Sequence, residues 1–171
     1  YKRQIYLVGR NAATGELLND ATSCLMCRRM IINAGIRRVV VSTYQAVSGS
    51  GQKGISELET QVRQMFNLKE PEVNVYPHRI AFNCIPHIDV FLENDYTKEE
   101  MKMFNETRKI MHSDIQVSAM CVRVPALRSH SESIWVETER PISPEEAREA
   151  FAKGEGLVLM DNCLLYTSPS P

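Results

Sequence analysis

Five polar side chains have the types and spacing to act on a small charged molecule. Arg123 carries a planar guanidinium that matches the two oxygens of a carboxylate, and His130, seven residues later, can shuttle a proton near neutral pH. Glu106 and Lys109 are three residues apart in an expected helix, so they share a face and can bind groups of opposite charge. Gln45 ends a β-branched run and can orient a polar group by hydrogen bonding. Taken singly, the helix pair is more often a solvated ion pair, the arginine a surface charge and the histidine a polar loop residue.

A glycine-rich segment, SGSGQKG, follows the run that ends at Gln45. In it, Ser48 and Gly49 can present backbone N–H groups to a nucleotide phosphate. A plain turn is a nearly equal alternative. Both interpretations require the segment to be a loop.

The elements that must position these residues follow from hydrophobic periodicity and capping signals. Thr97 and Glu100 form a T-x-x-E capping box, and Ser143 is an N-cap followed by Pro144 at the first helical position. The pattern predicts strands over 5–8, 37–41, 115–124, 133–138 and 157–160, helices over 24–34, 55–66, 97–111 and 144–153, and an irregular or edge segment over 80–92. The predicted fold class is α/β, with an α+β-like mixed sheet and helices on one face.

The apolar stripes of the predicted helices define the expected core. On the helix over 55–66 the stripe consists of Ile55, Leu58, Val62, Met65 and Phe66. On the helix over 97–111 it consists of Met101, Phe104, Ile110 and Met111.

The composition restricts the class of protein. The chain has 171 residues, with 20 Lys and Arg against 21 Asp and Glu, 43% apolar residues and a mean hydropathy of −0.27, which is typical of one soluble globular domain. The balanced charge argues against nucleic acid as a partner, and no apolar run is long enough for a membrane span. Five cysteines, an odd number, without a secretory signal indicate reduced thiols and a cytoplasmic location.

Residues 35–162 resemble the C-terminal part of aspartate-β-semialdehyde dehydrogenases. The resemblance lies in GIRRVVVSTYQAVSGSG (35–51), YPHRIAFNCIPHIDVF (76–91), YTKEEMKMFNETRKIM (96–111), CVRVPALRSHSESIWVETE (121–139) and PISPEEAREAF (141–151). It implies a mixed α/β catalytic and dimerisation domain, a homodimer, and NADP-dependent interconversion of aspartate β-semialdehyde and aspartyl phosphate, on the route to lysine, threonine and methionine.

The same resemblance implies a role for each candidate residue. Arg123 binds the substrate α-carboxylate, His130 is the acid/base, and Gln45 orients the reacting carbonyl. Glu106 and Lys109 meet the substrate ammonium and the phosphate. Because all five occur together inside the matching runs, the resemblance favours a site over the separate ordinary alternatives.

Two parts that this family's reaction needs are missing from the sequence. The family pattern places the nucleophilic cysteine, which attacks the aldehyde and forms an acyl thioester, at or near Leu18. Cys84 and Cys121 lie within apolar runs and are expected to be packed core thiols. No G-x-G-x-x-G precedes residue 35, so the dinucleotide-binding half is absent. We therefore expect the chain alone to be inactive.

Residues 5–41 resemble the C-terminal half of a zinc-dependent deoxycytidylate (dCMP) deaminase. By this resemblance Cys24 and Cys27 are two zinc ligands one helical turn apart. A third ligand and the catalytic glutamate are missing, since no histidine precedes His78, so the expected state is two reduced thiols in an incomplete metal site. A deaminase fragment and a catalytically inactive dimerisation module are the alternative functions.

The two ends of the chain resemble translated sequencing-adapter ends. These are YKRQ (1–4) and CLLYTSPSP (163–171), and the second is expected to be disordered. The predicted organisation is therefore an artefact at 1–4, a deaminase-like fragment at 5–41, a partial dehydrogenase domain at 35–162 and a second artefact at 163–171. The whole is expected to be a chimeric open reading frame.

Overall fold

The structure is a computed structural model that describes residues 35–154 and 157–159. Its contacts divide the chain into two compact units, Arg37–Glu137 on the one hand and Tyr1–Ile36 with Thr138–Pro171 on the other. The strand predicted over 5–8, the helix predicted over 24–34 and the predicted disorder of 163–171 lie outside the described residues.

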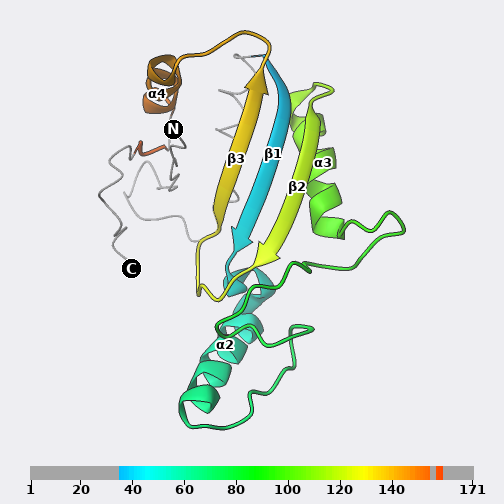
Figure 1. The fold of residues 1–171 in the computed structure, drawn as a ribbon, viewed down its shortest axis with the longest axis vertical. Coiled ribbons are helices and arrows are strands. Elements are labelled where there is room, and N and C mark those ends of the chain that lie inside the picture. Colours follow the sequence, from blue (N-terminus) through cyan, green and yellow to red (C-terminus); the bar gives the residue numbers. More distant parts are fainter. Residues whose placement is uncertain (1–34, 155–156, 160–171) are drawn as a thin grey trace. The chain divides into compact units, whose positions relative to one another are not determined.

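A three-stranded mixed sheet is the framework of the first unit (Figure 1). Strands β1 (Ile36–Gln45), β2 (Gln116–Arg123) and β3 (Ser131–Thr138) are ordered β2-β1-β3. β1 and β2 are parallel and in register from Arg38 opposite Gln116 to Gln45 opposite Arg123, while β3 runs the other way. The β-branched run in β1 explains its central place, because such side chains pack well on both neighbours. The predicted strand over 37–41 thus continues four residues further.

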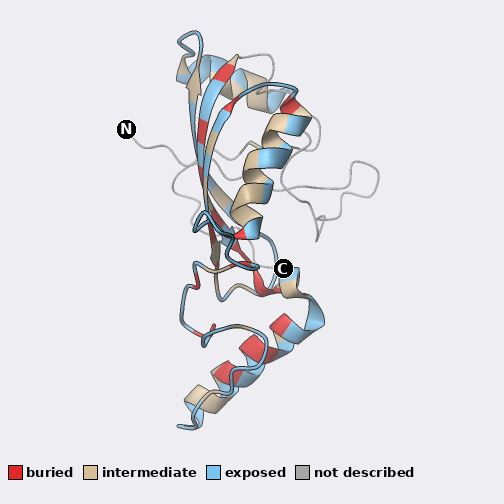
Figure 2. Cartoon of the chain, turned by 90° about the vertical axis from the view of Figure 1, so that its right-hand side faces the viewer, coloured by how far each residue is buried: buried red, intermediate tan, exposed pale blue. Residues whose placement is uncertain are grey.

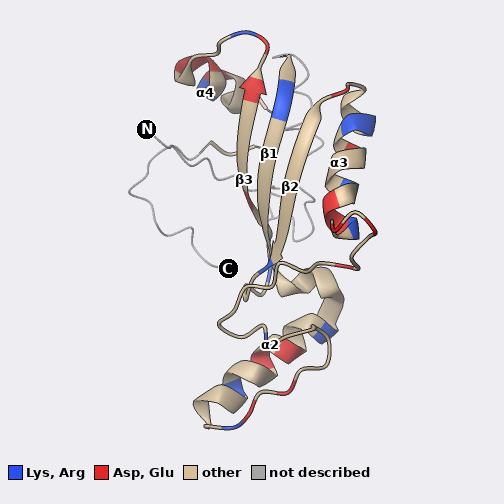
Figure 3. Ribbon diagram, turned by 45° about the vertical axis from the view of Figure 1, so that its right-hand side comes forward, with Lys and Arg blue, Asp and Glu red and all other residues tan. Residues whose placement is uncertain are grey.

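Helix α3 (Lys98–Met111) lies along one face of this sheet, against β2 (Figures 1 and 2). The predicted capping box is confirmed: the Thr97 hydroxyl accepts from the Glu100 N–H, and the Glu100 carboxylate accepts from the Thr97 N–H. Glu99 and Glu100 in the first turn and Arg108 and Lys109 in the last complement the helix dipole (Figure 3). The capped start fixes the position of α3 at the carboxyl ends of β1 and β2.

Helix α2 (Gly51–Phe66) follows a short 3₁₀ helix, η1 (Val47–Ser50), beyond the end of β1. The glycine-rich segment predicted as a loop is therefore helical. Its apolar side packs into a core cluster of Val47, Leu58, Ile80, Ala81 and Ile85, with Ile55, Val62, Met65 and Tyr76 against it. Phe66, predicted in the buried stripe, is 77% exposed and makes an edge contact with Phe82. Phe66 is the last residue of α2, so its ring lies beyond the core cluster.

Two buried polar side chains of α2 hold the extended segment over 72–81. The Glu57 carboxylate accepts from the N–H groups of Asn74, Val75 and Tyr76 and from the Gln61 amide. Gln61, fully buried, also donates to the Glu72 carbonyl and accepts from the N–H groups of Ile80 and Ala81. These bonds replace the ladder that a segment without regular structure lacks. The irregular segment predicted over 80–92 is confirmed, with isolated bridges at Ile85 and Phe91.

The second unit contains helix α4 (Pro144–Ala152). Ser143 caps it as predicted, and Glu146 completes a capping box. The strand predicted over 157–160 is wrong for residues 157–159, which have no regular structure. Within the described residues, no helix combines the length and apolar character that a membrane span needs.

Candidate functional site

The carboxyl ends of β1 and β2 bring Gln45 and Arg123 side by side. The two residues are partners in the parallel register, so their side chains leave the sheet on the same face about 4.8 Å apart. Both are almost fully buried, with 6% and 7% of their surface exposed. The sequence predicted both as site residues, and the sheet supplies the physical reason for their proximity.

Arg123 is a buried cation without a carboxylate partner in the described part of the chain. Its Nη1 atom donates a hydrogen bond to the Ala46 carbonyl oxygen at 2.8 Å. Burial lowers the pKa of Arg123 from its ordinary value, and the charges of Tyr76 and Glu99 offset part of that effect. A guanidinium removed from water in this way favours an anion that can meet its remaining donors.

His130 joins this pair through the same backbone residue. The Ala46 N–H donates to His130 Nδ1 at 3.1 Å, so in the neutral imidazole the proton is on Nε2. Gly49 faces both side chains: a Cβ at this position would lie 2.8 Å from Arg123 Nη1 and 3.4 Å from His130 Nε2. A side chain at position 49 would therefore have to displace the end of Arg123.

The backbone donors of Ser48 and Gly49 are already used. The Ser48 N–H donates to the Leu127 carbonyl at 3.2 Å and the Gly49 N–H to the Ala46 carbonyl at 3.2 Å. The phosphate cradle predicted from these two residues is therefore not formed. The Ser48 bond joins η1 to the segment that follows β2, and Gly49 lies against the end of Arg123.

Glu106 and Lys109 lie further from this group. Both are exposed on α3, and neither makes a hydrogen bond or ion pair with Gln45 or Arg123 in the described residues. An α-helix rises about 1.5 Å per residue, which puts Glu106 about 10 Å along the axis from Glu99. The structure therefore does not bring these two predicted residues to Gln45 and Arg123.

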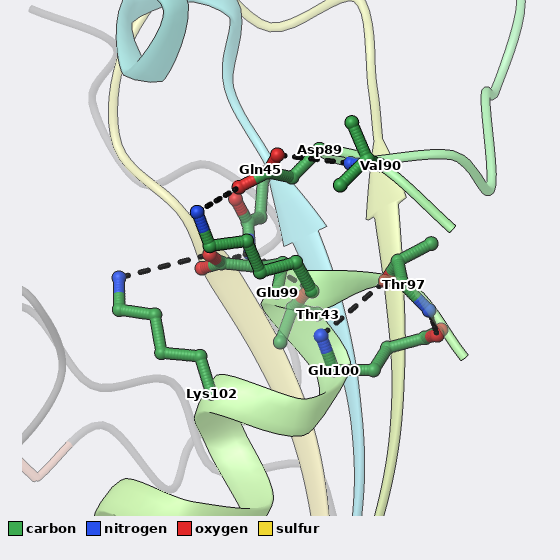
Figure 4. Close-up of polar contacts among 9 residues, drawn as sticks. Thr43, Gln45, Asp89, Val90, Thr97, Glu99, Glu100 and Lys102 are labelled. Carbon is green, nitrogen blue, oxygen red and sulfur yellow. Dashed lines mark hydrogen bonds and ion pairs between the residues drawn. The ribbon is translucent and has the colours of Figure 1, made fainter. Parts of the chain in front are cut away.

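Glu99 is the site residue that the sequence analysis missed. Its Oε1 accepts from Gln45 Nε2 at 3.4 Å, and its Oε2 lies 3.6 Å from Lys102 Nζ (Figure 4). The capping box places Glu99 in the first turn of α3, at the end of β1. Two adjacent glutamates in a predicted first turn were the available signal, but the contact joins residues 54 apart.

The two described cysteines differ in environment. Cys121 is fully buried, as predicted, and burial raises the pKa of its thiol to about 11. Cys84, predicted as a core thiol, is exposed because the irregular segment alternates less regularly than a strand. The buried Cys121 is therefore not a preformed thiolate nucleophile at neutral pH. Cys24 and Cys27 lie outside the described residues, in which no cluster of metal-binding side chains occurs.

Two surface hollows do not coincide with this group. One lies beside Glu57 on α2 and the other between α3 and β2. Neither is lined by Gln45, Arg123 or His130. The candidate site is therefore the cluster at the strand ends, defined by side-chain chemistry.

Comparison with known proteins places this arrangement in a family. The family model described as "Semialdehyde dehydrogenase, dimerisation domain" matches residues 29–170. The chain belongs to the semialdehyde dehydrogenase family through this domain. The predicted resemblance over 35–162 and the predicted fold class are thereby confirmed.

The similar proteins are aspartate-semialdehyde dehydrogenases. The one from Aquifex aeolicus (strain VF5) is 59% identical over 140 residues, which cover 81% of this chain and 41% of that protein. A crystal structure of aspartate semialdehyde dehydrogenase II from Vibrio cholerae, complexed with ASA, has a TM-score of 0.73 and 46% identity over 74% of this chain and 38% of its own. The chain thus spans about two fifths of the length of these relatives.

The comparisons give no support to the other two resemblances. The family match includes residues 163–170, which the sequence analysis assigned to an adapter-like end. The Helicobacter pylori (strain J99) aspartate-semialdehyde dehydrogenase aligns over 94% of the chain at 43% identity, so the alignment also reaches residues of the deaminase-like part. The segment boundaries predicted from the sequence stay predictions.

Proposed function

We propose that this chain is the catalytic and dimerisation part of an NADP-dependent aspartate-semialdehyde dehydrogenase and that its strand-end site binds the aspartyl substrate. The observation that carries this proposal is Arg123, a buried guanidinium with no carboxylate partner in the described residues. A ligand with an α-carboxylate would meet its unused donors in the bidentate geometry that guanidinium favours. The relatives' names and the Vibrio cholerae complex with ASA support aspartate semialdehyde as that ligand.

The other residues have roles that suit the same substrate. The Nε2–H of His130 can donate to the oxygen that becomes an alkoxide when a thiolate adds to the aldehyde. Glu106 and Lys109 stay proposed as partners of the ammonium and the phosphate. For them to contact a ligand that is bound at Arg123, that ligand would have to extend along α3.

NADP belongs to the proposal through the family resemblance, and it would act as the hydride donor or acceptor. The backbone of Ser48 and Gly49 does not fit a phosphate, because its N–H groups are already bonded. Other residues would have to hold the cofactor. Since the family nucleophile falls near Leu18, we propose that this chain alone does not turn over.

A homodimer is the proposed assembly. Val40, Tyr44 and Met120 lie on the sheet face opposite α3 and are 41%, 44% and 56% exposed. A sheet face with this much exposed apolar surface gains stability when another apolar surface covers it. A second copy of this dimerisation domain is the occupant that we propose. A location in the cytoplasm stays a prediction from composition.

Isothermal titration of the full chain with aspartate semialdehyde tests the substrate. Replacing Arg123→Met removes the fork, and the loss of two charge-assisted hydrogen bonds should weaken binding about hundredfold or more. Arg128→Met is the matched control, since Arg128 is exposed in the loop that leads to His130. Equal binding by the two variants would exclude Arg123 as the carboxylate site.

The inactivity of the chain has its own assay. With aspartate semialdehyde, phosphate and NADP present, we expect no NADPH formation above a protein-free blank. Clear turnover would contradict the inference that the chain lacks the nucleophilic cysteine. Nothing in the described residues favours a deaminase, so we do not propose that function.

A further inference from the structure

The end of helix α2 carries an exposed apolar cluster. Phe66 and Phe82 meet edge to face, with their ring centroids 6.1 Å apart, and Leu68 follows two residues after Phe66. All three side chains are exposed, and Leu68 is 96% exposed. Neighbouring apolar side chains left open to water are typical of a surface that another protein covers. The cluster is therefore a candidate interface.

Two members of this cluster have a backbone conformation that apolar residues rarely adopt. Leu68 has a φ of 55° and Phe82 a φ of 56°, in the left-handed region that favours glycine. Leu68 directly follows the Asn67 cap of α2, a position where glycine is common. A leucine here is thus disfavoured both by its backbone and by its exposure to water. Covering its side chain with an apolar surface would offset these costs.

Cations flank this cluster along the chain. The stretches that carry it, 63–70 and 79–82, contain three cations and one anion, which are Arg63, Lys69, Arg79 and Glu70. Lys69 and Arg79 make no ion pair within the part of the chain that the structure describes. We call the apolar cluster together with these two cations the tip patch: Phe66, Leu68 and Phe82 with Lys69 and Arg79.

In the loop that leads into α3, a second exposed apolar cluster has the opposite charge (Figures 1 and 3). Its turn contains Glu93 and Asp95, and neither acid makes an ion pair within the described residues. The neighbouring Asp89 is paired with Lys98 at 3.9 Å, so those two charges cancel. We call this surface the loop patch, and it consists of Val90, Phe91, Leu92 and Tyr96 with Glu93 and Asp95.

We propose that the tip patch of one copy of this chain binds the loop patch of a second copy. Both are apolar surfaces, and their charges are complementary, which favours this pairing over like with like. A second copy is the occupant because the same chain supplies the matching surface and belongs to a dimerisation domain family. Two copies related by a two-fold axis would make the contact twice. These residues differ from the sheet face of Val40, Tyr44 and Met120, so the two surfaces can be tested separately.

Sedimentation velocity of the full chain over a dilution series tests the pairing. Lys69→Glu with Arg79→Glu makes both patches acidic, and Glu93→Lys with Asp95→Lys makes both basic. Each double variant alone should self-associate about tenfold more weakly, whereas an equimolar mixture should recover the original affinity, because the tip of one then matches the loop of the other. Lys53→Glu with Arg128→Glu reverses two exposed cations elsewhere and should leave the affinity unchanged.

Three results of this series would overturn the proposal. The first is an unsubstituted chain that stays monomeric, and the second is an equal affinity for all variants. The third is a weakening that the mixture does not reverse, which would assign the tip patch to a different partner. The assay needs neither ligand nor turnover, so its outcome is independent of the proposed function.

Leu68→Gly separates an interface from a structural role. Glycine suits the left-handed backbone, so the urea midpoint should not fall, while the loss of the exposed side chain should weaken self-association about fivefold. A lower midpoint with unchanged association would contradict the tip patch as an interface.

Cross-linking tests whether the two patches meet. Chains with Leu68→Cys are mixed with chains with Glu93→Cys, all carrying Cys84→Ser, and treated with a short bismaleimide. Peptide mass spectrometry should then find residue 68 of one chain joined to residue 93 of another. Gln52→Cys, exposed at the other end of α2, replaces Leu68→Cys in the control and should give no such product. Absence of the 68–93 product would overturn the proposal.

Discussion

Replacing Glu57→Gln should destabilise the fold through the segment over 72–81. The Glu57 carboxylate accepts four hydrogen bonds, three from the successive N–H groups of Asn74, Val75 and Tyr76 and one from Gln61. A glutamine has one acceptor oxygen, so its amide nitrogen would face the N–H groups of Asn74 and Val75. Losing two hydrogen bonds to a charged group costs about 3 kcal/mol when the donors stay buried. Because Asn74 and Val75 are exposed and can bond to water, we expect about 2 kcal/mol.

Urea denaturation of the full chain, followed by circular dichroism, measures this cost. With a slope near 2 kcal/mol per molar, the midpoint should fall by about 1 M. Glu59→Gln, on the same helix but exposed, is the control and should shift it by less than about 0.2 M. Amide exchange at residues 74–76 should also accelerate in the Glu57 variant alone. Equal midpoints for the two variants would refute the interpretation of this carboxylate as an anchor.

Three further predictions follow from individual contacts. Gly49→Ala should weaken binding of aspartate semialdehyde in titration, because the added Cβ would lie 2.8 Å from Arg123 Nη1; unchanged affinity would show that the space is not needed. Thr97→Ala should lower the free energy of unfolding by about 1 kcal/mol in urea, unless another group caps α3. Iodoacetamide at pH 8 should label Cys84 and spare Cys121, as read by peptide mass spectrometry. Since the pKa of Cys121 is raised from 9.0 to about 11, its thiol stabilises the folded state below pH 9, and that contribution is lost as the pH rises through 9 to 11.

The sequence was informative where the signal is local. The Thr97 capping box and the Ser143 cap follow from side chains three residues apart, and both formed as predicted. Phe66 shows the limit of the same reasoning, because periodicity assigns a residue to a helix face but not to a place along the core. Cys84 fails for a related reason, since its segment lacks the regular alternation that decides which side chains are buried.

The kind of site could be predicted from the sequence, but only some of the residues that form it could. Resemblance to a family selected Gln45, Arg123 and His130, and the structure brings these three together around the Ala46 backbone. Glu99 could not be found in this way, because its contact with Gln45 depends on where α3 begins relative to the sheet. For Ser48 the sequence could not show that its N–H meets the Leu127 carbonyl, which only folding brings near, whereas the Gly49 N–H bonds to Ala46 within the same local turn.

The parallel register of β1 and β2 sets a rule for how this protein can change in length. Side chains alternate between the faces of a strand, so removing one residue from β2 would turn Arg123 to the face opposite α3 and away from Gln45. Removing two would restore the face but shorten the strand by about 6.6 Å. Insertions and deletions compatible with binding should therefore fall in the loops around β1 and β2, and within these strands odd-numbered changes should be the most damaging.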